Sequence, residues 1–188
     1  PVALDDILSV GVAKNLPLVL CTTGYNEEQL AKINEASKKV AILRSANMSL
    51  GINLLLGLVQ AAAKVLSDAN FDIELVEKHH NQKIDAPSGT AITIAEGIIE
   101  ANSSKTEWVN QLGDTMPDQV LKPDQLLINS LRIDEVPGTH TVVYSSEVDE
   151  IMFQHTAHNR AGFALGAVVA AEWLENKQGF YSVEDVFN

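Results

Sequence analysis

The chain has a single cysteine among its 188 residues, and it lacks any long apolar run. Cys21 alone cannot form an internal disulfide, which fits a reducing compartment such as the cytoplasm. No apolar stretch reaches the roughly 18 residues that a membrane-spanning helix requires. Residues 1–6 have neither the basic start nor the apolar core of a signal peptide. These absences predict a cytoplasmic protein that does not insert into a membrane.

Basic side chains are scarce as well, because 13 Lys and Arg face 25 Asp and Glu, for a formal net charge of −12. This balance argues against nucleic acid as a partner, since binding a phosphate backbone needs a basic face. It does not exclude small anions, because a few local cations can dominate a pocket. With 46% apolar and 20% charged residues, the composition is typical of a globular protein.

Phosphate-cradling glycine loops are missing too. Neither G-x-G-x-x-G nor G-x-x-x-x-G-K-[ST] occurs anywhere in the sequence. Thr22, Thr23 and Gly24 follow a short apolar run, at the place where the loops of an open parallel sheet meet a ligand. On its own, however, this is a common turn sequence.

The elements that are present alternate between helix and strand. In the first part we expect a helix at 4–15, a strand at 16–21, a helix at 26–37 and a strand at 40–43. Asn26 is a suitable N-cap for the second helix. Helix, strand, helix, strand with short connections predicts a parallel α/β sheet.

The rest of the chain is richer in strands. There we expect helices at 51–67, 87–101 and 158–176, and strands at 71–77, 125–135, 139–146 and 149–155. Residues 102–125 are polar and contain Gly113, Pro117 and Pro123, which predicts a long loop. A strand-rich middle between two α/β pieces indicates an inserted second domain.

The most informative segment is E-K-H-H-N-Q-K-I-D-A-P-S-G-T-A at residues 77–91. His79 and His80 stand at the end of an expected strand, with Lys83 close by in sequence. An imidazole can donate a proton near neutral pH, and an ammonium group can hold a negative group in place. Two surface histidines at a strand terminus are the alternative, but the cluster as a whole favours a proton donor beside an anion site.

Ser88, Gly89 and Thr90 begin the expected helix at 87–101. The first N–H groups of a helix have no partner within it, so a helix start can bind an anion, and a glycine lets the ligand approach the backbone. Capping alone, by Asp85 or Ser88, explains the same residues equally well.

Metal binding and nucleophilic catalysis find little support. The two closest non-adjacent histidines, His155 and His158, have no Cys or carboxylate at a zinc-like spacing, so we predict no metal. Cys21 has no base near it in sequence. Arg160, at the start of the last expected helix, is either a substrate contact or part of a surface ion pair.

Residues 77–91 resemble the signature E-x-H-H-x-x-K-x-D-A-P-S-G-T-A of the dihydrodipicolinate reductase family, also called 4-hydroxy-tetrahydrodipicolinate reductase. Every fixed position of that pattern is present. The resemblance continues in L-C-T-T-G-Y at residues 20–25, A-N-M-S-L-G-I-N at 46–53 and F-Q-H-T-A-H-N-R at 153–160. It therefore spans nearly the whole chain.

The resemblance implies an α/β fold with two parts. Residues 1–49 and 156–188 would be the C-terminal part of a Rossmann-like parallel-sheet nucleotide-binding domain. Residues 50–155 would be an inserted α+β substrate-binding and oligomerisation domain with an open mixed sheet. The family begins with a strand, a glycine-rich fingerprint and a helix, which this sequence lacks. We therefore expect the N-terminal part of the nucleotide domain to be missing, so that residues 16–21 form an unpaired edge.

The resemblance also implies an activity. The family transfers a hydride from NADPH or NADH to a cyclic unsaturated imine dicarboxylate, on the path to diaminopimelate and lysine. The family assembles into homotetramers through the sheet of the substrate domain. A chain without the cofactor fingerprint is expected to be inactive alone. The alternative is a non-catalytic dicarboxylate-binding and oligomerising module.

Residue roles follow from the same resemblance. His79 would be the general acid, and Lys83 would assist catalysis and contact the substrate together with His80. A ring carboxylate would be held by Ser88, Gly89 and Thr90. The residues implied at the cofactor are Thr22, Thr23 and Gly24 beside the nicotinamide, Ala46 and Met48 through their backbone, and Arg160.

Overall fold

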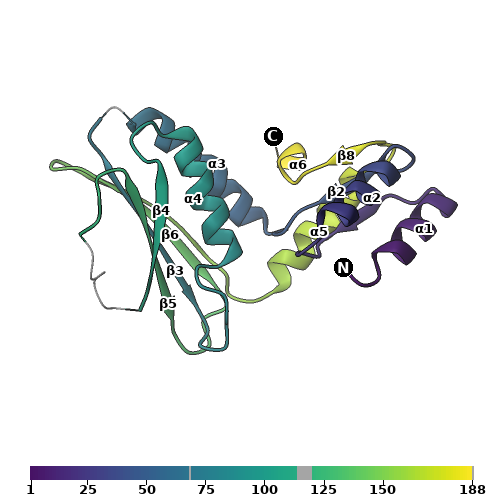
Figure 1. Cartoon of the computed structure of the whole chain (residues 1–188), viewed down its shortest axis with the longest axis horizontal. Helices are drawn as coiled ribbons and strands as arrows, with labels where there is room; N and C mark the ends of the chain where they lie inside the picture. Colours follow the sequence, from purple (N-terminus) through teal and green to yellow (C-terminus); the bar gives the residue numbers. More distant parts are fainter. Residues whose placement is uncertain (68, 114–119, 188) are drawn as a thin grey trace. The chain divides into compact units, whose positions relative to one another are not determined.

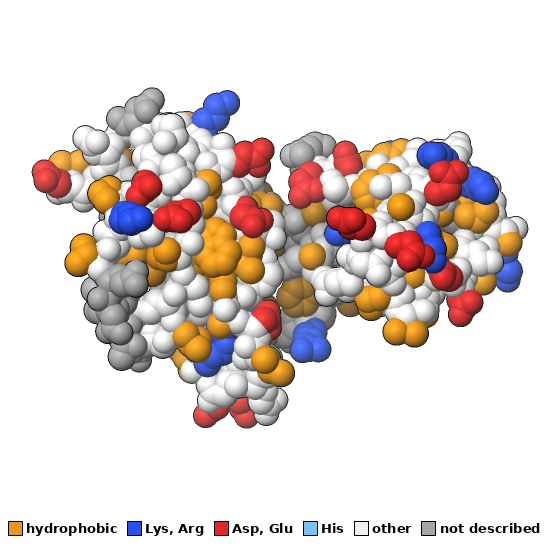
Figure 2. Space-filling model, in the orientation of Figure 1, with side chains coloured by type: hydrophobic (Ala, Val, Ile, Leu, Met, Phe, Trp, Pro, Cys, Tyr) orange, Lys and Arg blue, Asp and Glu red, His pale blue; other side chains and the backbone are white. Residues whose placement is uncertain are grey.

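The computed structural model describes residues 1–67, 69–113 and 120–187. They form two compact units, of which unit 1 comprises Pro1–Asn53 and Ala161–Asn188 and unit 2 comprises Leu54–Arg160. Among the described residues, no helix has the length and apolarity to cross a membrane. Acidic side chains are spread over the surface of both units, as the net charge requires (Figure 2).

Unit 1 contains a small parallel sheet with helices around it. Its elements are α1 (Leu4–Lys14), β1 (Leu18–Leu20), α2 (Glu27–Ser37), β2 (Ile42–Arg44), α5 (Ala161–Trp173), β8 (Phe180–Tyr181) and α6 (Glu184–Phe187). The strand order is β1-β2-β8, and both pairs are parallel. This confirms the parallel α/β sheet, and within the described residues β1 lies at an edge of it, as expected.

The local sequence explains these elements well. Asn26 caps α2, since its side chain accepts a hydrogen bond from Gln29 N at 2.9 Å while Gln29 Oε1 accepts one from Asn26 N at 3.1 Å. Successive residues of β2 face opposite sides of the sheet. Ile42 therefore belongs to the core cluster beneath α1 and α2, and Leu43 to the cluster beneath α5. Both faces of the strand are covered, which accounts for its continuous apolar sequence.

Helix α5 packs unusually close to the segment that follows β2. A Cβ on Gly166 would lie 1.7 Å from the carbonyl oxygen of Met48. The side chain of Met48 is buried against Ala170 and Leu174 of the same region. The small residues of α5 therefore fix the backbone position of the loop after β2.

Unit 2 is built on a mixed sheet of five strands. They are β3 (Asp72–His79), β4 (Glu107–Leu112), β5 (Gln125–Arg132), β6 (Thr139–Ser145) and β7 (Glu150–Thr156), in the order β4-β5-β3-β6-β7. β3 is parallel to β5, and β5 is parallel to β4. β6 is antiparallel to β3 and to β7.

Two helices cover one face of this sheet (Figure 1). They are α3 (Leu50–Leu66), which begins in unit 1, and α4 (Gly89–Ala101). The buried hydroxyl of Tyr144 donates a hydrogen bond to the carbonyl oxygen of Val59 at 2.5 Å, which joins β6 to α3. The expected open mixed sheet is thus confirmed.

The expected loop at 102–125 was wrong in part, because β4 lies within it. β4 is an edge strand of intermediate burial, so its sequence does not carry an apolar signal. Long-range pairing with β5 forms it, and Ser130 Oγ donates to Asn110 Oδ1 at 2.7 Å across that pair. Residues 114–119 of the expected loop lie outside the described residues.

Candidate active site

The carboxyl end of β3 brings Glu77 and His79 together. Residues two apart on a strand share a face, and here both side chains are buried. Glu77 Oε2 is hydrogen-bonded to His79 Nδ1. An ionised carboxylate can only accept hydrogen bonds, so Nδ1 carries the hydrogen and Nε2 is the ring nitrogen left for another partner.

The other oxygen of Glu77 has two further donors. Oε1 accepts hydrogen bonds from Arg132 Nη2 at 2.9 Å and from Ser88 N at 3.3 Å. Arg132 ends β5, directly beside His79 in the strand register. Burial alone would raise the pKa of Glu77, but hydrogen bonds from His79, Arg132 and Ser130 lower the pKa to about 2. Glu77 is therefore a buried anion at neutral pH.

His140 adds a second imidazole from strand β6. It lies opposite Glu77 in the register, and its ring centroid is 5.2 Å from that of His79, edge to face. His140 Nε2 lies 3.2 Å from Ser88 Oγ. Burial lowers the pKa of His140 to about 3, so this ring is neutral at physiological pH.

Ser88 is the N-cap of α4, as one of the two sequence-based alternatives predicted. Its Oγ accepts a hydrogen bond from Ala91 N at 3.2 Å. Gly89 follows and is exposed, and a Cβ added to it would have no heavy atom within 4 Å. The capped helix start is therefore open on the side of Gly89, so capping and ligand approach are compatible here.

Lys83 and His80 lie in the segment between β3 and α4. Lys83 Nζ contacts both carboxylate oxygens of Asp85 at 2.8 Å, which shows that this ammonium group can hold a carboxylate. Its hydrogen bonds lower the pKa of Asp85. In the described part of the chain, buried His80 Nδ1 has no hydrogen-bond partner. Lys83 is therefore placed to bind a carboxylate, whereas the nitrogen of His80 without a partner is buried.

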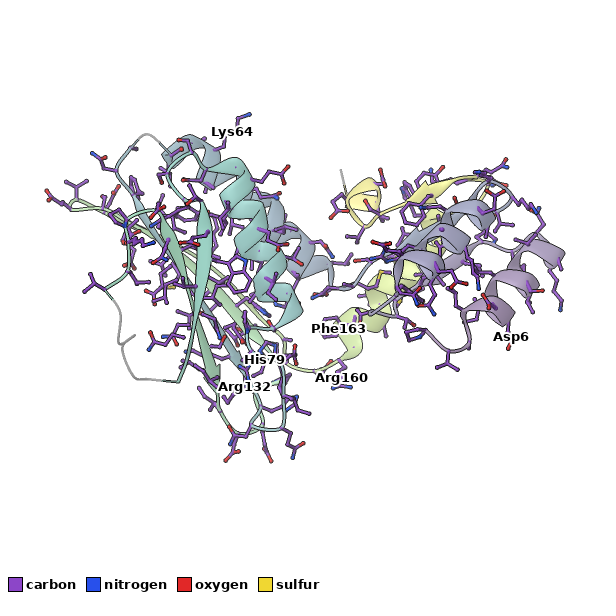
Figure 3. The ribbon with its side chains drawn as sticks, viewed as in Figure 1. Asp6, Lys64, His79, Arg132, Arg160 and Phe163 are labelled. Atoms are coloured by element: carbon purple, nitrogen blue, oxygen red, sulfur yellow. The ribbon has the colours of Figure 1, made fainter. Side chains whose placement is uncertain are left out.

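The sequence identified only part of this cluster. His79, His80, Lys83 and Ser88 all lie at one end of unit 2, where Figure 3 shows His79 near Arg132 and far from Lys64. Glu77 was assigned no role from the sequence, although it occupies a fixed position of the signature. Its spacing of two residues from His79 on an expected strand indicates that the two side chains share a face. Arg132 and His140 were missed because no local pattern links them to residues 77–91.

The same cluster must also be considered as a metal site. Glu77, His79 and His140 each offer one ligand atom, and these atoms lie within 4.8 Å of one another. The guanidinium group of Arg132 already shares the carboxylate and opposes a second cation there. The hydrogen bonds described above account for the arrangement without an ion.

Comparison with known proteins decides the family. The model for the C-terminus of dihydrodipicolinate reductase matches residues 51–187, and the model for its N-terminus matches residues 1–48. The chain belongs to the dihydrodipicolinate reductase family. The resemblance based on residues 77–91 is therefore confirmed, and with it membership of an oxidoreductase family of diaminopimelate and lysine biosynthesis.

Individual proteins named as reductases of this family give the same result. The chain is 43% identical over 185 residues to 4-hydroxy-tetrahydrodipicolinate reductase of Caldanaerobacter subterraneus subsp. tengcongensis, covering 98% of this chain and 72% of that protein. It is 43% identical over 187 residues to the enzyme of Clostridium novyi, covering 99% and 73%. A dipicolinate-bound dihydrodipicolinate reductase from Paenisporosarcina sp. TG-14 has a similar structure, with a TM-score of 0.75, 25% identity, and coverage of 97% of this chain and 68% of that one.

Dihydrodipicolinate reductases use NADPH or NADH, and the candidate cofactor residues lie mostly in unit 1. Thr22, Thr23 and Gly24 are exposed in the loop after β1, and Ala46 is exposed after β2. Ser45 N donates to Leu20 O at 3.2 Å, so the two loops leave neighbouring strands side by side.

The other two candidate cofactor residues, Met48 and Arg160, are not among the exposed residues of these loops. The side chain of Met48 is buried in the core, and its carbonyl oxygen faces Gly166. Arg160 is exposed and directly precedes α5, at the end of unit 2. The loops after β1 and β2 therefore present exposed residues at the carboxyl ends of two neighbouring parallel strands.

Proposed function

We propose that this chain carries the substrate site of a reductase that converts 4-hydroxy-tetrahydrodipicolinate to tetrahydrodipicolinate with NADPH or NADH. The observation that carries the proposal is the His79 ring, held at Nδ1 by the buried Glu77 carboxylate. This proton donor stands in the same segment as the cation Lys83 and the open start of α4. The names of the relatives in Caldanaerobacter and Clostridium and of the dipicolinate-bound structure support the same substrate class.

Different residues of unit 2 contact different groups of the substrate. Lys83 and His80 bind one ring carboxylate, and Ser88, Gly89 and Thr90 bind the other at the start of α4. The bound nicotinamide cofactor supplies the hydride. His79 donates a proton from Nε2 to the ring, while its Nδ1–H stays on Glu77. Lys83 also stabilises the negative charge of the dicarboxylate during the reaction.

The cofactor contacts belong to unit 1 and to the end of unit 2. Thr22, Thr23 and Gly24 lie beside the nicotinamide, with Ala46 and Met48 contributing backbone groups and Arg160 a positive charge. This assignment is supported by the exposure of the loop after β1 and by Gly24, which lacks a side chain that would block a ligand and adopts a positive φ of 76° without strain.

The two parts of the chain take separate roles. Residues 1–49 and 156–188 belong to dinucleotide binding, and residues 50–155 bind the substrate and form the oligomer. A homotetramer assembled through the helix-free face of the sheet accords with the open sheet and with Met152, which β7 leaves exposed on that face, opposite Val143 in the register.

The decisive experiment is an assay of the protein encoded by the complete open reading frame that contains these 188 residues. We expect oxidation of NADPH or NADH only when the cyclic dicarboxylate is supplied. Failure to oxidise either cofactor in the presence of this substrate would contradict the proposal.

A second candidate is a non-catalytic module that binds dicarboxylates and oligomerises. The open start of α4 beside Gly89 accords with binding of a dicarboxylate without catalysis. Both candidates predict that the 188-residue chain binds dipicolinate, which calorimetry measures. Turnover separates them, because the complete protein of a non-catalytic module does not oxidise NADPH or NADH.

A further inference from the structure

Glu77 is a buried carboxylate at a fixed position of the signature. The proposed substrate contacts do not include it. Its exposed surface is zero, and its partners come from three different elements. His79 is two residues away on β3, Arg132 ends β5, and Ser88 N starts α4. A buried anion costs several kcal/mol unless every lone pair is used, so such a group is retained in a core for a reason beyond packing.

The contact with His79 determines which nitrogen of that ring is protonated. Because the carboxylate oxygen accepts from Nδ1, the neutral ring is held as the Nδ1–H tautomer. When a second proton is present it is on Nε2, and that proton is the one which leaves toward the substrate. After the transfer the ring is neutral, Nδ1–H still donates to Glu77, and Nε2 takes up the next proton from water.

Arg132 holds the carboxylate in the orientation that this requires. Its Nη2 donates both to Glu77 Oε1 at 2.9 Å and to the carbonyl oxygen of Asp85 at 2.6 Å, and its Nη1 donates to Leu131 O at 2.8 Å. Because Asp85 lies two residues from Lys83, the same guanidinium group ties the Glu77–His79 pair to the substrate-binding segment.

The opposite side of the ring is left clear by Gly138. A Cβ on Gly138 would lie 3.1 Å from His79 Nε2 and 3.3 Å from its Cδ2, closer than nine in ten real contacts. The ring is thus held at Nδ1 by a hydrogen bond, and the missing side chain of Gly138 leaves room beside Nε2.

The geometry points to Glu77 as a positioning residue of the reductase, which fixes the Nδ1–H tautomer and the orientation of His79, with Arg132 holding Glu77. This inference rests on the proposed function, in which His79 is the general acid. Glu77 does not touch the substrate, so its removal lowers the rate of proton transfer and leaves dicarboxylate affinity unchanged.

The first test is a double-mutant cycle in the complete protein. We expect Glu77→Gln to lower kcat by about a hundredfold or more, with KM for the dicarboxylate within about threefold. In the His79→Gln background, Glu77→Gln should lower kcat no further than about twofold, because its effect passes through His79. A further loss of tenfold or more in that background would overturn the inference. Glu96→Gln, which removes an exposed carboxylate from α4, is the control expected to leave kcat unchanged.

The second test needs no substitution. Magnetic resonance of isotope-labelled histidine in the unmodified chain reports which nitrogen of His79 carries hydrogen in the neutral ring. Hydrogen on Nδ1 supports the inference, and hydrogen on Nε2 overturns it even where Glu77→Gln fails to fold. If His79→Gln turns over normally, the proposed acid is wrong. If Glu77→Gln turns over normally while His79→Gln does not, His79 remains the proposed acid and the positioning role of Glu77 is wrong.

Discussion

Ser88 Oγ lies 3.2 Å from His140 Nε2, and this contact joins the first turn of α4 to strand β6. The same hydroxyl accepts from Ala91 N, so one side chain caps the helix and holds the neutral imidazole. Through Ser88 N the helix start also reaches Glu77 on β3. The start of α4 is thus attached to the ends of β3 and β6 that carry Glu77 and His140 by direct hydrogen bonds.

His79→Gln tests the proton donor. We expect kcat to fall by between about a hundredfold and ten-thousandfold, because the amide cannot donate a proton to the ring of the substrate. Steady-state kinetics on the complete protein measures this. Calorimetry with dipicolinate provides the control, since the affinity of the variant should stay within a few-fold of the unmodified chain. Normal turnover would remove His79 as the acid.

Lys83→Ala tests the carboxylate contact. Loss of a charge-assisted hydrogen bond should weaken dipicolinate binding by about tenfold or more, measured by calorimetry. Lys64→Ala is the matched control, because Lys64 is exposed at the far end of unit 2 (Figure 3) and should leave affinity unchanged. Equal affinities for the two variants would place Lys83 outside the site.

Gly138→Ala tests the close approach to His79. The added methyl group would lie 3.1 Å from Nε2, so the ring must move and kcat should fall by about tenfold or more. Gly57→Ala introduces the same methyl group into open space on α3, and it should keep activity and raise the free energy of unfolding by roughly 0.5–1 kcal/mol. Unchanged kinetics in the Gly138 variant would show that the ring tolerates displacement.

His140 gives the chain a defined dependence on pH. Its pKa is 6.5 in the unfolded chain and about 3 when folded, so between these values the unfolded state binds a proton that the folded state does not. This contribution to stability is fully present above pH 6.5 and is lost as the pH falls toward 3. Over that window His140 should lower the free energy of unfolding by up to about 1.4 kcal/mol per pH unit.

Urea unfolding at a series of pH values measures this slope. Glu77, with its pKa lowered from 4.5 to about 2, acts in the same direction but only at lower pH. Well above pH 4.5 the slope therefore comes from His140 and His155, whose pKa values burial lowers. His140→Asn should flatten the slope there, and an unchanged slope would mean that His140 is protonated in the folded chain.

Much of the fold could be predicted because its signals are local. The Asn26 cap, the apolar runs of β1 and β2 and the helical spacing of α3 each lie within one segment. The signature at residues 77–91 likewise carried His79, Lys83 and Ser88 in one stretch. β4 was missed because an edge strand of mixed polarity is determined by its partner β5, far away in sequence.

The sequence by itself therefore determined the family, the parallel sheet of unit 1 and the donor-rich segment at residues 77–91 that we propose as the substrate site. Only the tertiary structure decided how His79 is held, because Arg132 and His140 come from β5 and β6, and Gly138 from the turn before β6. The physical reason is that the protonation and orientation of a buried ring depend on the groups packed around it. Those groups are brought together by strand pairing and leave no trace in the local pattern.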